Sequence, residues 1–362
     1  MGRMLIQAAA NLNIDVHILD PAANAPCASL ATRFVQGNLK DYDTVLAFGQ
    51  ACDIITIEIE HVNVEALKAL EQQGKTVYPQ PEVIALIQDK RTQKQFYQAK
   101  GLPTAPFVLT DSRAALQQHT GMLPAVHKLG REGYDGRGVQ MIHTEADLDK
   151  GFDAPGVLEV KADIDKELAV IVARNPSGQV KAYPATELAY HPTENLVEYL
   201  FAPASIDAAT AQRAEALACQ VIEALDMTGL LAVEMFLNND GQLWVNEVAP
   251  RPHNSGHHTI EASYTSQYEQ HLRTLYDMPL GNTDSRSPAV MVNLLGAAGH
   301  TGTARHEGID AVLALPGAHV HLYGKKTTKP FRKMGHVTLT GPDLDTLKAN
   351  AKIVKEQIRI VS

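Results

Sequence analysis

Short apolar runs rich in Val and Ile alternate with helix-like segments along the first part of the chain. The pattern predicts a helix over residues 3–13, a strand over 14–20 and a further strand over 53–58. Apolar runs that are separated by helices are typical of parallel strands buried on both faces. We therefore expect an α/β unit with a parallel sheet over residues 1–88.

The pattern changes after this unit. A helix that starts at Asp89 and ends near Gly101 leads into a linker with two prolines, which predicts a domain boundary. Strands and helices then mix, and the last part of the chain is rich in short strands. The predicted division is 1–88, 89–280 and 281–362. Within the last unit we expect strands over 289–295, 318–322 and 336–340 and a closing helix over 344–358.

Composition excludes several classes of protein. The hydrophobic content of 45% and charged content of 20% are ordinary for a globular chain. The formal net charge of −9 argues against a nucleic-acid partner. No apolar run approaches the roughly 20 residues of a membrane span, and the first residues lack a signal-peptide pattern. The three cysteines are scattered, which indicates neither disulfides nor zinc. We expect a cytoplasmic protein with no membrane partner.

Two strand-like segments, 229–237 and 242–248, flank the turn-forming residues 238–241 and predict a β-hairpin. With that loop, Glu234 faces Val245 and lies diagonal to Glu247, about 7–8 Å away. Two carboxylates in a buried sheet repel each other unless a cation lies between them. Hard oxygen ligands favour Mg²⁺, which in such sites usually bridges nucleotide phosphates.

Polar residues are concentrated just after the second strand of this hairpin. Asn246, Glu247, Arg251, His253 and Asn254 fall within nine residues. An acid, a cation, an imidazole and two amides are costly to bury unless each has a partner. The prolines at 250 and 252 stiffen the segment. A binding site is the favoured interpretation, and a solvated loop is the alternative.

The segment 128–138 contains four glycines and begins with Lys128. Such a loop lets backbone N–H groups approach phosphate oxygens, while the lysine supplies a charge. A Gly-rich loop alone is weak evidence, and a mobile surface hairpin is the alternative. Together with the carboxylate pair, a loop that covers phosphates is favoured.

Glu234, Asn246-Glu247 and the run that ends Arg-Pro-His-Asn-Ser-Gly-His resemble the ATP-grasp N5-carboxyaminoimidazole ribonucleotide synthetase family. The similarity extends from Gly2 to about Gly341. It implies an α/β chain with a Rossmann-like pre-ATP-grasp domain, a central ATP-grasp domain and a small β-rich C-terminal domain. The family opens with a strand before Gly2-Arg3-Met4, so the resemblance predicts that the first strand of the N-terminal sheet is missing here.

The resemblance also implies site residues. ATP is expected to contact Lys90, Lys128, Gly133, Tyr134, Asp135, Gly136, Arg137, Gly138, Glu159, Val160, Lys161, Ala162, Glu167, Asn246 and Glu247. Tyr134, Asp135 and Arg137 are expected to face the second substrate as well. The chain departs from the family at Glu132, commonly Gly, and at Tyr190, often His, to which we assign no role.

The implied reaction is carboxylation of 5-aminoimidazole ribonucleotide by bicarbonate and ATP, through carboxyphosphate, in purine biosynthesis. Mg²⁺ is expected on Glu234 and Glu247. Arg251, His253 and Asn254 are expected to be the catalytic residues and to hold bicarbonate and the carboxylated species. Lys325 and Arg332 match the family's basic pair for the ribotide 5′-phosphate, and a solvated basic turn is the alternative there. The family also implies a homodimer.

Three alternatives stay open. One is another ATP-grasp ligase with an acyl-phosphate intermediate, such as a formate-dependent glycinamide ribonucleotide transformylase. A second is a non-catalytic nucleotide-binding paralogue. The third, an NAD-dependent dehydrogenase, is the least favoured because no G-x-G-x-x-G follows a first strand.

Overall fold

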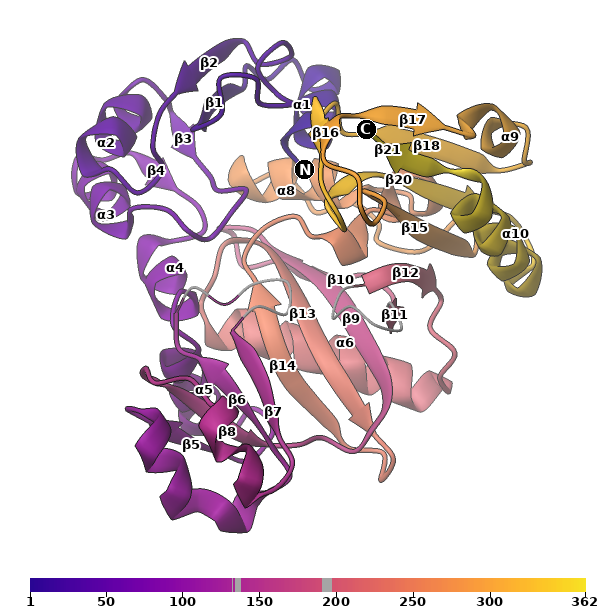
Figure 1. Cartoon of the computed structure of the whole chain (residues 1–362). Coiled ribbons are helices and arrows are strands. Elements are labelled where there is room, and N and C mark those ends of the chain that lie inside the picture. The colour runs from indigo at the N-terminus through magenta and orange to yellow at the C-terminus, as the bar shows by residue number, and fades with distance from the viewer. Residues whose placement is uncertain (132, 134–137, 191–196) are drawn as a thin grey trace.

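The structure, a computed structural model, describes residues 1–131, 133, 138–190 and 197–362. Figure 1 shows three regions: an N-terminal α/β unit, a small antiparallel sheet, and a large sheet that reaches the C-terminal strands. In the part of the chain that is described, no helix combines the length and apolar character that a membrane crossing requires.

The N-terminal unit contains two pairs of parallel strands, as the pattern predicted. The strands are β1 (His17–Asp20) with β2 (Arg33–Gln36) and β3 (Ile54–Ile55) with β4 (Thr76–Val77). Among the described residues, the two pairs are not hydrogen-bonded to each other. The first helix is confirmed as α1 (Gly2–Asn11), and α2 (Tyr42–Gln50) and α3 (Val64–Gln72) follow. The prediction of a missing first strand stays a prediction.

Two helices connect this unit to the rest of the molecule, α4 (Pro81–Ile87) and α5 (Lys90–Ala99). The side chain of Asp89 caps α5 by accepting a hydrogen bond from the backbone N–H of Arg91. The predicted helix start is therefore confirmed, and its cause is the capping carboxylate. After α5 the chain enters the small sheet through the linker.

The small sheet has the strand order β5-β8-β6-β7 and is antiparallel throughout. Its strands are β5 (Phe107–Thr110), β6 (Ala125–Leu129), β7 (Val139–Ile142) and β8 (Gly156–Val160), with the 3₁₀ segments η1 (Arg113–Met122) and η2 (Glu145–Lys150) between them. Leu116, Ala125 and Leu158 form the core between this sheet and η1. The sheet makes one wall of the site described below.

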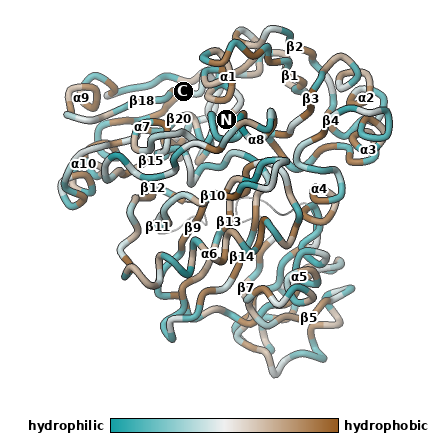
Figure 2. Tube along the Cα trace, turned by 180° about the vertical axis from the view of Figure 1, so that it is seen from behind, coloured by the Kyte–Doolittle hydropathy of each residue, from teal (hydrophilic) through white to brown (hydrophobic). Residues whose placement is uncertain are grey.

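The large sheet has the order β14-β13-β9-β11-β12-β15-β20-β18, and β10 pairs with β9. Helix α6 packs on β9 and β13 through a core that includes Leu217, Val221, Val170 and Leu231. Figure 2 shows hydrophobic and polar segments alternating along α6, as expected for a helix with one buried face. The elements are β9 (Ile164–Arg174), β10 (Val180–Ala182), β11 (Thr186–Tyr190), β12 (Val197–Ala202), α6 (Ala208–Ala224), β13 (Gly229–Asn238) and β14 (Leu243–Ala249).

The C-terminal strands continue this sheet, because β12 pairs with β15. The predicted strands 289–295 and 318–322 are confirmed as β15 and β18, whereas the third, β20, begins earlier, at Lys333. The closing helix is confirmed as α10 and packs on β15 and β20. The elements are η3 (Asn254–Gly256), α7 (Thr259–Ala262), α8 (Gln267–Leu275), β15 (Ala289–Leu295), β16 (Gly302–Thr303), β17 (Arg305–Glu307), α9 (Ile309–Leu313), β18 (Ala318–Leu322), β19 (Thr327–Thr328), β20 (Lys333–Thr340), α10 (Leu344–Gln357) and β21 (Arg359–Val361).

Candidate functional site

A cavity of about 790 Å³ lies between the small sheet and the large sheet. Residues of β6, β7 and β8 line one side, and residues of β9, β13 and β14 line the other. The N-terminal unit adds Ile59, Glu60 and His61, and β20 adds Lys333. All three regions of the molecule therefore meet at one site, whose volume suits a nucleotide-sized ligand.

The β13–β14 hairpin contains a bulge that decides which side chains enter the cavity. Glu234 pairs directly with Glu247, whereas the next residue, Met235, pairs with Val245. The predicted pairing of Glu234 with Val245 is wrong because Asn246 is an extra residue in the ladder. A bulge redirects consecutive side chains. As a result, both Asn246 and Glu247 line the cavity.

The carboxylates of Glu234 and Glu247 repel each other, and Glu234 is shielded from solvent. Burial raises the pKa of Glu234 to about 7, and the charges of Glu247 and Glu167 contribute to the rise, while Lys333 and Lys90 oppose it. Lys90 Nζ forms an ion pair with Glu247 Oε1. Among the described residues, no group of three or more His, Cys, Asp or Glu side chains is arranged for a metal ion. Glu234 and Glu247, which pair across the hairpin and both line the cavity, are the carboxylates available here as ligands for a cation.

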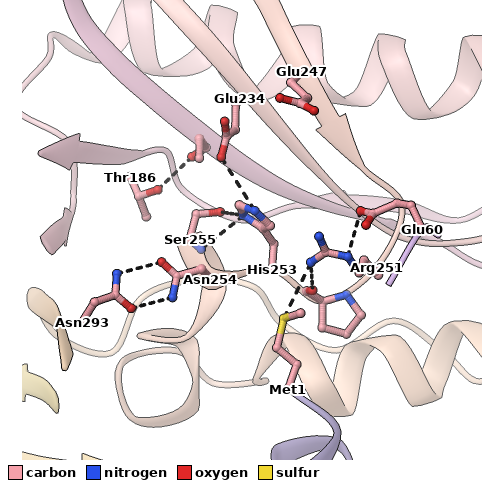
Figure 3. Close-up of polar contacts among 12 residues, drawn as sticks. Met1, Glu60, Thr186, Glu234, Glu247, Arg251, His253, Asn254, Ser255 and Asn293 are labelled. Carbon is pink, nitrogen blue, oxygen red and sulfur yellow. Dashed lines mark hydrogen bonds and ion pairs between the residues drawn. The ribbon is translucent and has the colours of Figure 1, made fainter. Parts of the chain in front are cut away.

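Figure 3 shows how the segment after β14 turns back toward these acids. Arg251 Nε lies 2.8 Å from Glu60 Oε1, so a residue of the N-terminal unit fixes the guanidinium. His253 Nε2 lies 3.8 Å from Glu234 Oε1, and His253 Nδ1 lies 2.9 Å from Ser255 Oγ. Burial, with the charges of Arg251 and Lys333, lowers the pKa of His253 well below its usual range. The imidazole is therefore neutral at pH 7.

Asn254 faces the cavity but its amide group is already paired. Asn254 Nδ2 donates to Asn293 Oδ1 at 2.8 Å, and Asn293 Nδ2 donates to Asn254 Oδ1 at 3.0 Å (Figure 3). The same Asn293 nitrogen also donates to the carbonyl oxygen of Val197. In this structure β15 brings up a complementary amide that pairs with Asn254, and the expected contact of Asn254 with bicarbonate stays a prediction.

The opposite end of the cavity is basic. Lys128 Nζ lies 3.0 Å from Glu159 Oε2 and donates to Asn246 Oδ1 at 2.9 Å. Burial on its own would raise the pKa of Glu159, but the nearby Lys128 and Lys94 outweigh it and the pKa is lowered. Glu159 is therefore ionised, and Lys128 connects the small sheet to the large one.

The middle of the cavity combines an apolar slot with a buried acid. Val126, Met141, Val160 and Phe236 line the slot from both sheets. Glu167 on β9 is deeply placed; burial raises its pKa, and a hydrogen bond from Tyr190 and the charge of Lys128 partly offset the rise. Apolar walls with an acid at one end suit a heteroaromatic base and its ribose.

The structure gathers most of the predicted site residues in this one cavity. Those that line it are Lys90, Lys128, Gly133, Glu159, Val160, Lys161, Ala162, Glu167, Glu234, Asn246, Glu247, Arg251, His253 and Asn254. Gly138, Lys325 and Arg332 do not line it. Tyr134, Asp135, Gly136 and Arg137, together with Glu132, lie outside the described residues.

The basic turn of the C-terminal unit presents a lysine other than the predicted Lys325 to this cavity, and the predicted phosphate contacts of Lys325 and Arg332 stay predictions. Lys333 lines the cavity, whereas Lys325 Nζ donates to the carbonyl oxygen of Lys333 at 2.7 Å. Arg332 Nη1 donates to the carbonyl oxygen of Thr327 at 2.7 Å. Lys333 is the first residue of β20, whereas Arg332 lies in the turn before that strand.

Sequence reasoning missed Glu60, Asn293, Lys333 and the buried Lys94. Glu60 and Asn293 come from units remote in sequence, and no local pattern marks them. Lys333 lay beside the basic residues that were singled out. Lys94 stands in a run of lysine, arginine and glutamine that reads as a solvated helix face.

Family models match three parts of the chain. Residues 1–88 match the ribonucleotide synthetase preATP-grasp domain, residues 95–268 the ATP-grasp domain, and residues 289–350 the phosphoribosylaminoimidazole carboxylase C-terminal domain. The order of the three agrees with the predicted organisation.

Curated relatives give the same picture. The N5-carboxyaminoimidazole ribonucleotide synthase of Synechococcus elongatus is 39% identical over 93% of this chain and 86% of its own length. The chloroplastic phosphoribosylaminoimidazole carboxylase of Vigna aconitifolia is 37% identical over 98% of this chain. This chain spans 65% of the length of the plant protein.

Solved structures are similar over nearly the whole chain. N5-carboxyaminoimidazole ribonucleotide synthetase from Thermotoga maritima has a TM-score of 0.92 at 37% identity, with 100% of this chain and 96% of that chain covered. The enzyme from Aspergillus clavatus, solved with ADP and 5-aminoimidazole ribonucleotide, has a TM-score of 0.90 at 32% identity, with coverage of 98% and 95%. With the cavity, the acid pair and the three domain matches, these likenesses establish that the chain belongs to the N5-carboxyaminoimidazole ribonucleotide synthase family of ATP-grasp proteins.

Proposed function

We propose that the protein uses ATP to carboxylate the 5-amino group of 5-aminoimidazole ribonucleotide with bicarbonate. The observation that carries the proposal is the meeting of three chemistries in one cavity. Lysines 90 and 128, the paired carboxylates Glu234 and Glu247, and Arg251 with His253 all line it. Membership of the family and the solved relative that holds ADP and the aminoimidazole nucleotide support the choice of substrates.

The chemistry requires an activated carboxyl donor. Bicarbonate is a poor electrophile because hydroxide is a poor leaving group. Transfer of the γ-phosphoryl group of ATP to a bicarbonate oxygen gives carboxyphosphate and ADP. Carboxyphosphate then releases phosphate and CO₂, and the amine attacks the CO₂ and loses a proton to form the carbamate.

The residues of this chain have distinct parts in that scheme. Lys90 and Lys128 neutralise phosphate oxygens, and Glu167 accepts hydrogen bonds from the ribose. Arg251, oriented by Glu60, binds the bicarbonate anion by charge-assisted hydrogen bonds. The neutral imidazole of His253 contributes a hydrogen bond without adding charge beside Arg251.

A magnesium ion fits the acid pair. The raised pKa of Glu234 follows from burial and from the opposing Glu247 and Glu167, and it is relieved when a cation is bound between carboxylates. Glu234 and Glu247 would hold the ion, which would supply positive charge to the phosphoryl group in transfer. Lys325 and Arg332 stay the predicted holders of the ribotide phosphate. A homodimer and a cytoplasmic location also stay predictions.

ADP release measured with each substrate omitted in turn tests the proposal. We expect release to require bicarbonate, the aminoimidazole nucleotide and Mg²⁺ together. Glu234→Gln is expected to lose at least about 10²-fold in rate, because it removes charge at the site of phosphoryl transfer. Glu71→Gln, an exposed substitution on α3 with the same charge change, is the control. Equal ADP release with formate in place of bicarbonate would identify a different ATP-grasp ligase.

A further inference from the structure

Lys94 is a buried cation directly behind the lysines of the cavity. It lies on α5, one turn after Lys90, and its side chain is 3% exposed. It does not line the main cavity but borders a space of about 10 Å³ together with Lys90, Lys128 and Glu159. A buried amine without direct access to a ligand needs a reason, because burial of charge costs free energy.

The partners of Lys94 join the two walls of the site. Its Nζ lies 3.2 Å from Glu159 Oε2 and donates to Thr104 Oγ1 at 2.6 Å. Thr104 Oγ1 in turn donates to the carbonyl oxygen of Val245, the residue before Asn246. Lys94 thus fixes β8 of the small sheet, the linker and β14 of the large sheet relative to α5.

Glu159 depends on lysines for its charge. Lys94 and Lys128 both contact Oε2, whereas Oε1 is buried and has no hydrogen-bond partner among the described residues. Removal of either lysine leaves the Glu159 carboxylate with one cation. Removal of both lysines leaves it with no cation partner. A buried carboxylate without a partner is strongly unfavourable.

The dependence of Glu159 on its two lysines matters because Lys128 also borders the cavity in which a ligand would bind. It lines the cavity, yet it is held by Glu159 and Asn246. Lys128 Nζ uses two of its three N–H donors on Glu159 and Asn246, so an incoming polyphosphate competes with Glu159 for the charge of this ammonium group. That competition costs less free energy if another cation stays on the same carboxylate oxygen, and Lys94 Nζ lies 3.2 Å from it.

We propose that Lys94 is a positioning residue for nucleotide binding, which keeps Glu159 paired so that Lys128 can turn to the phosphates. The inference rests on the proposed use of ATP but not on the identity of the acceptor. In this scheme Lys94 never touches the nucleotide. Its effect passes entirely through the charge of Glu159.

The first experiment compares Lys94→Met with Lys100→Met. Lys100 ends the same helix in an exposed position, so its substitution removes the same charge outside the network. We expect Lys94→Met to weaken binding of ATP, measured by calorimetry, by at least about tenfold, the worth of one charge-assisted hydrogen bond. The KM for ATP should rise by a similar factor while kcat changes less. Binding equal to that of the wild type would overturn the proposal.

The second experiment separates positioning from direct contact and from loss of folding. Glu159→Gln is made alone and together with Lys94→Met, and the folded state is monitored by the melting temperature. Because a neutral side chain at 159 no longer needs a cation, Lys94→Met should cost less than about threefold in ATP affinity in that background. A tenfold loss there would mean that Lys94 acts on the nucleotide directly or on the fold, and would overturn the proposal. The comparison holds whether or not Lys94→Met folds alone.

The binding experiments on Lys94 can be told apart from a test of the proposed carboxylation reaction. ATP binding needs no carboxyl acceptor, whereas the reaction is judged by bicarbonate-dependent ADP release. A wild-type protein that binds ATP without carboxylating the nucleotide would contradict the proposed function and leave the role of Lys94 to be decided by the binding data.

Discussion

Replacement of Glu234 by Gln should stabilise the ligand-free protein at the same time as it abolishes activity. In the folded protein the pKa of Glu234 is raised from 4.5 to about 7, chiefly by burial and then by Glu247 and Glu167. The folded state therefore binds this proton more tightly than the unfolded chain does. The free energy of unfolding must then fall as the pH rises from about 4.5 to about 7.

The size of the effect follows from the same shift. A pKa that rises from 4.5 to about 7 corresponds to about 3 kcal/mol of stability lost above pH 7. Because the side chain keeps 21% of its surface exposed to the cavity, solvent screening reduces this to about 1–3 kcal/mol. Glutamine has nearly the same shape and no charge, so Glu234→Gln should recover that amount at pH 8 and less than about 1 kcal/mol at pH 5.

The assay is thermal unfolding at pH 5 and pH 8, without nucleotide or metal. At pH 8 the melting temperature of Glu234→Gln should exceed that of the wild type by about 1–4 °C. Glu71→Gln, the exposed control, should leave both temperatures unchanged. Added Mg²⁺ and ADP should stabilise the wild type more than the variant, because only the wild type offers the full acid pair. An equal or lower melting temperature for the variant at pH 8 would refute the electrostatic reasoning.

The other predictions concern the ends of the cavity and the pH profile. Arg251→Ala should leave the ATP dissociation constant unchanged in calorimetry while ADP release loses its dependence on bicarbonate; a collapse of ATP affinity would assign Arg251 to the nucleotide site. Asn293→Ala should free the amide of Asn254 and destabilise the protein by about 1–2 kcal/mol in denaturant unfolding, and unchanged stability would show that the amide pair is not formed. ADP release should rise with pH through about 7 as Glu234 loses its proton, and more Mg²⁺ should move that rise to lower pH. If the pH at which ADP release rises does not change with the Mg²⁺ concentration, Glu234 does not bind the metal ion.

Local signals in the sequence were sufficient for much of the fold. The cap at Asp89, the turn before β14 and the apolar runs of β15 and β18 each depend on neighbours in the chain, so pattern reasoning located them. The site acids Glu234 and Glu247 were found in the same way, because both lie in one hairpin. The family resemblance then added the nucleotide contacts, including Glu167, which would otherwise read as a surface charge.

Features that depend on strand register or on contacts between distant segments could not be predicted. Alternation along a strand has a period of two, so one extra residue in the β13–β14 ladder changes which residue faces Glu234 without changing the apolar pattern. The contacts Glu60–Arg251 and Asn293–Asn254 join residues 191 and 39 positions apart in the chain. Neither Glu60 nor Asn293 lies in a sequence motif that indicates its role, since an isolated Glu or Asn is usually solvated.

The pairing of charges in the cavity explains why the N-terminal unit is needed for the site. Lys90 is held by Glu247, Lys128 by Glu159, and Arg251 by Glu60. Each of these three cations is thus paired with an acid in the absence of a substrate anion. Arg251 comes from the end of β14, whereas its acid comes from the N-terminal unit, so the contact forms only when the domains are docked. Binding of a substrate anion at Arg251 therefore depends on the docked arrangement in which Glu60 orients the guanidinium.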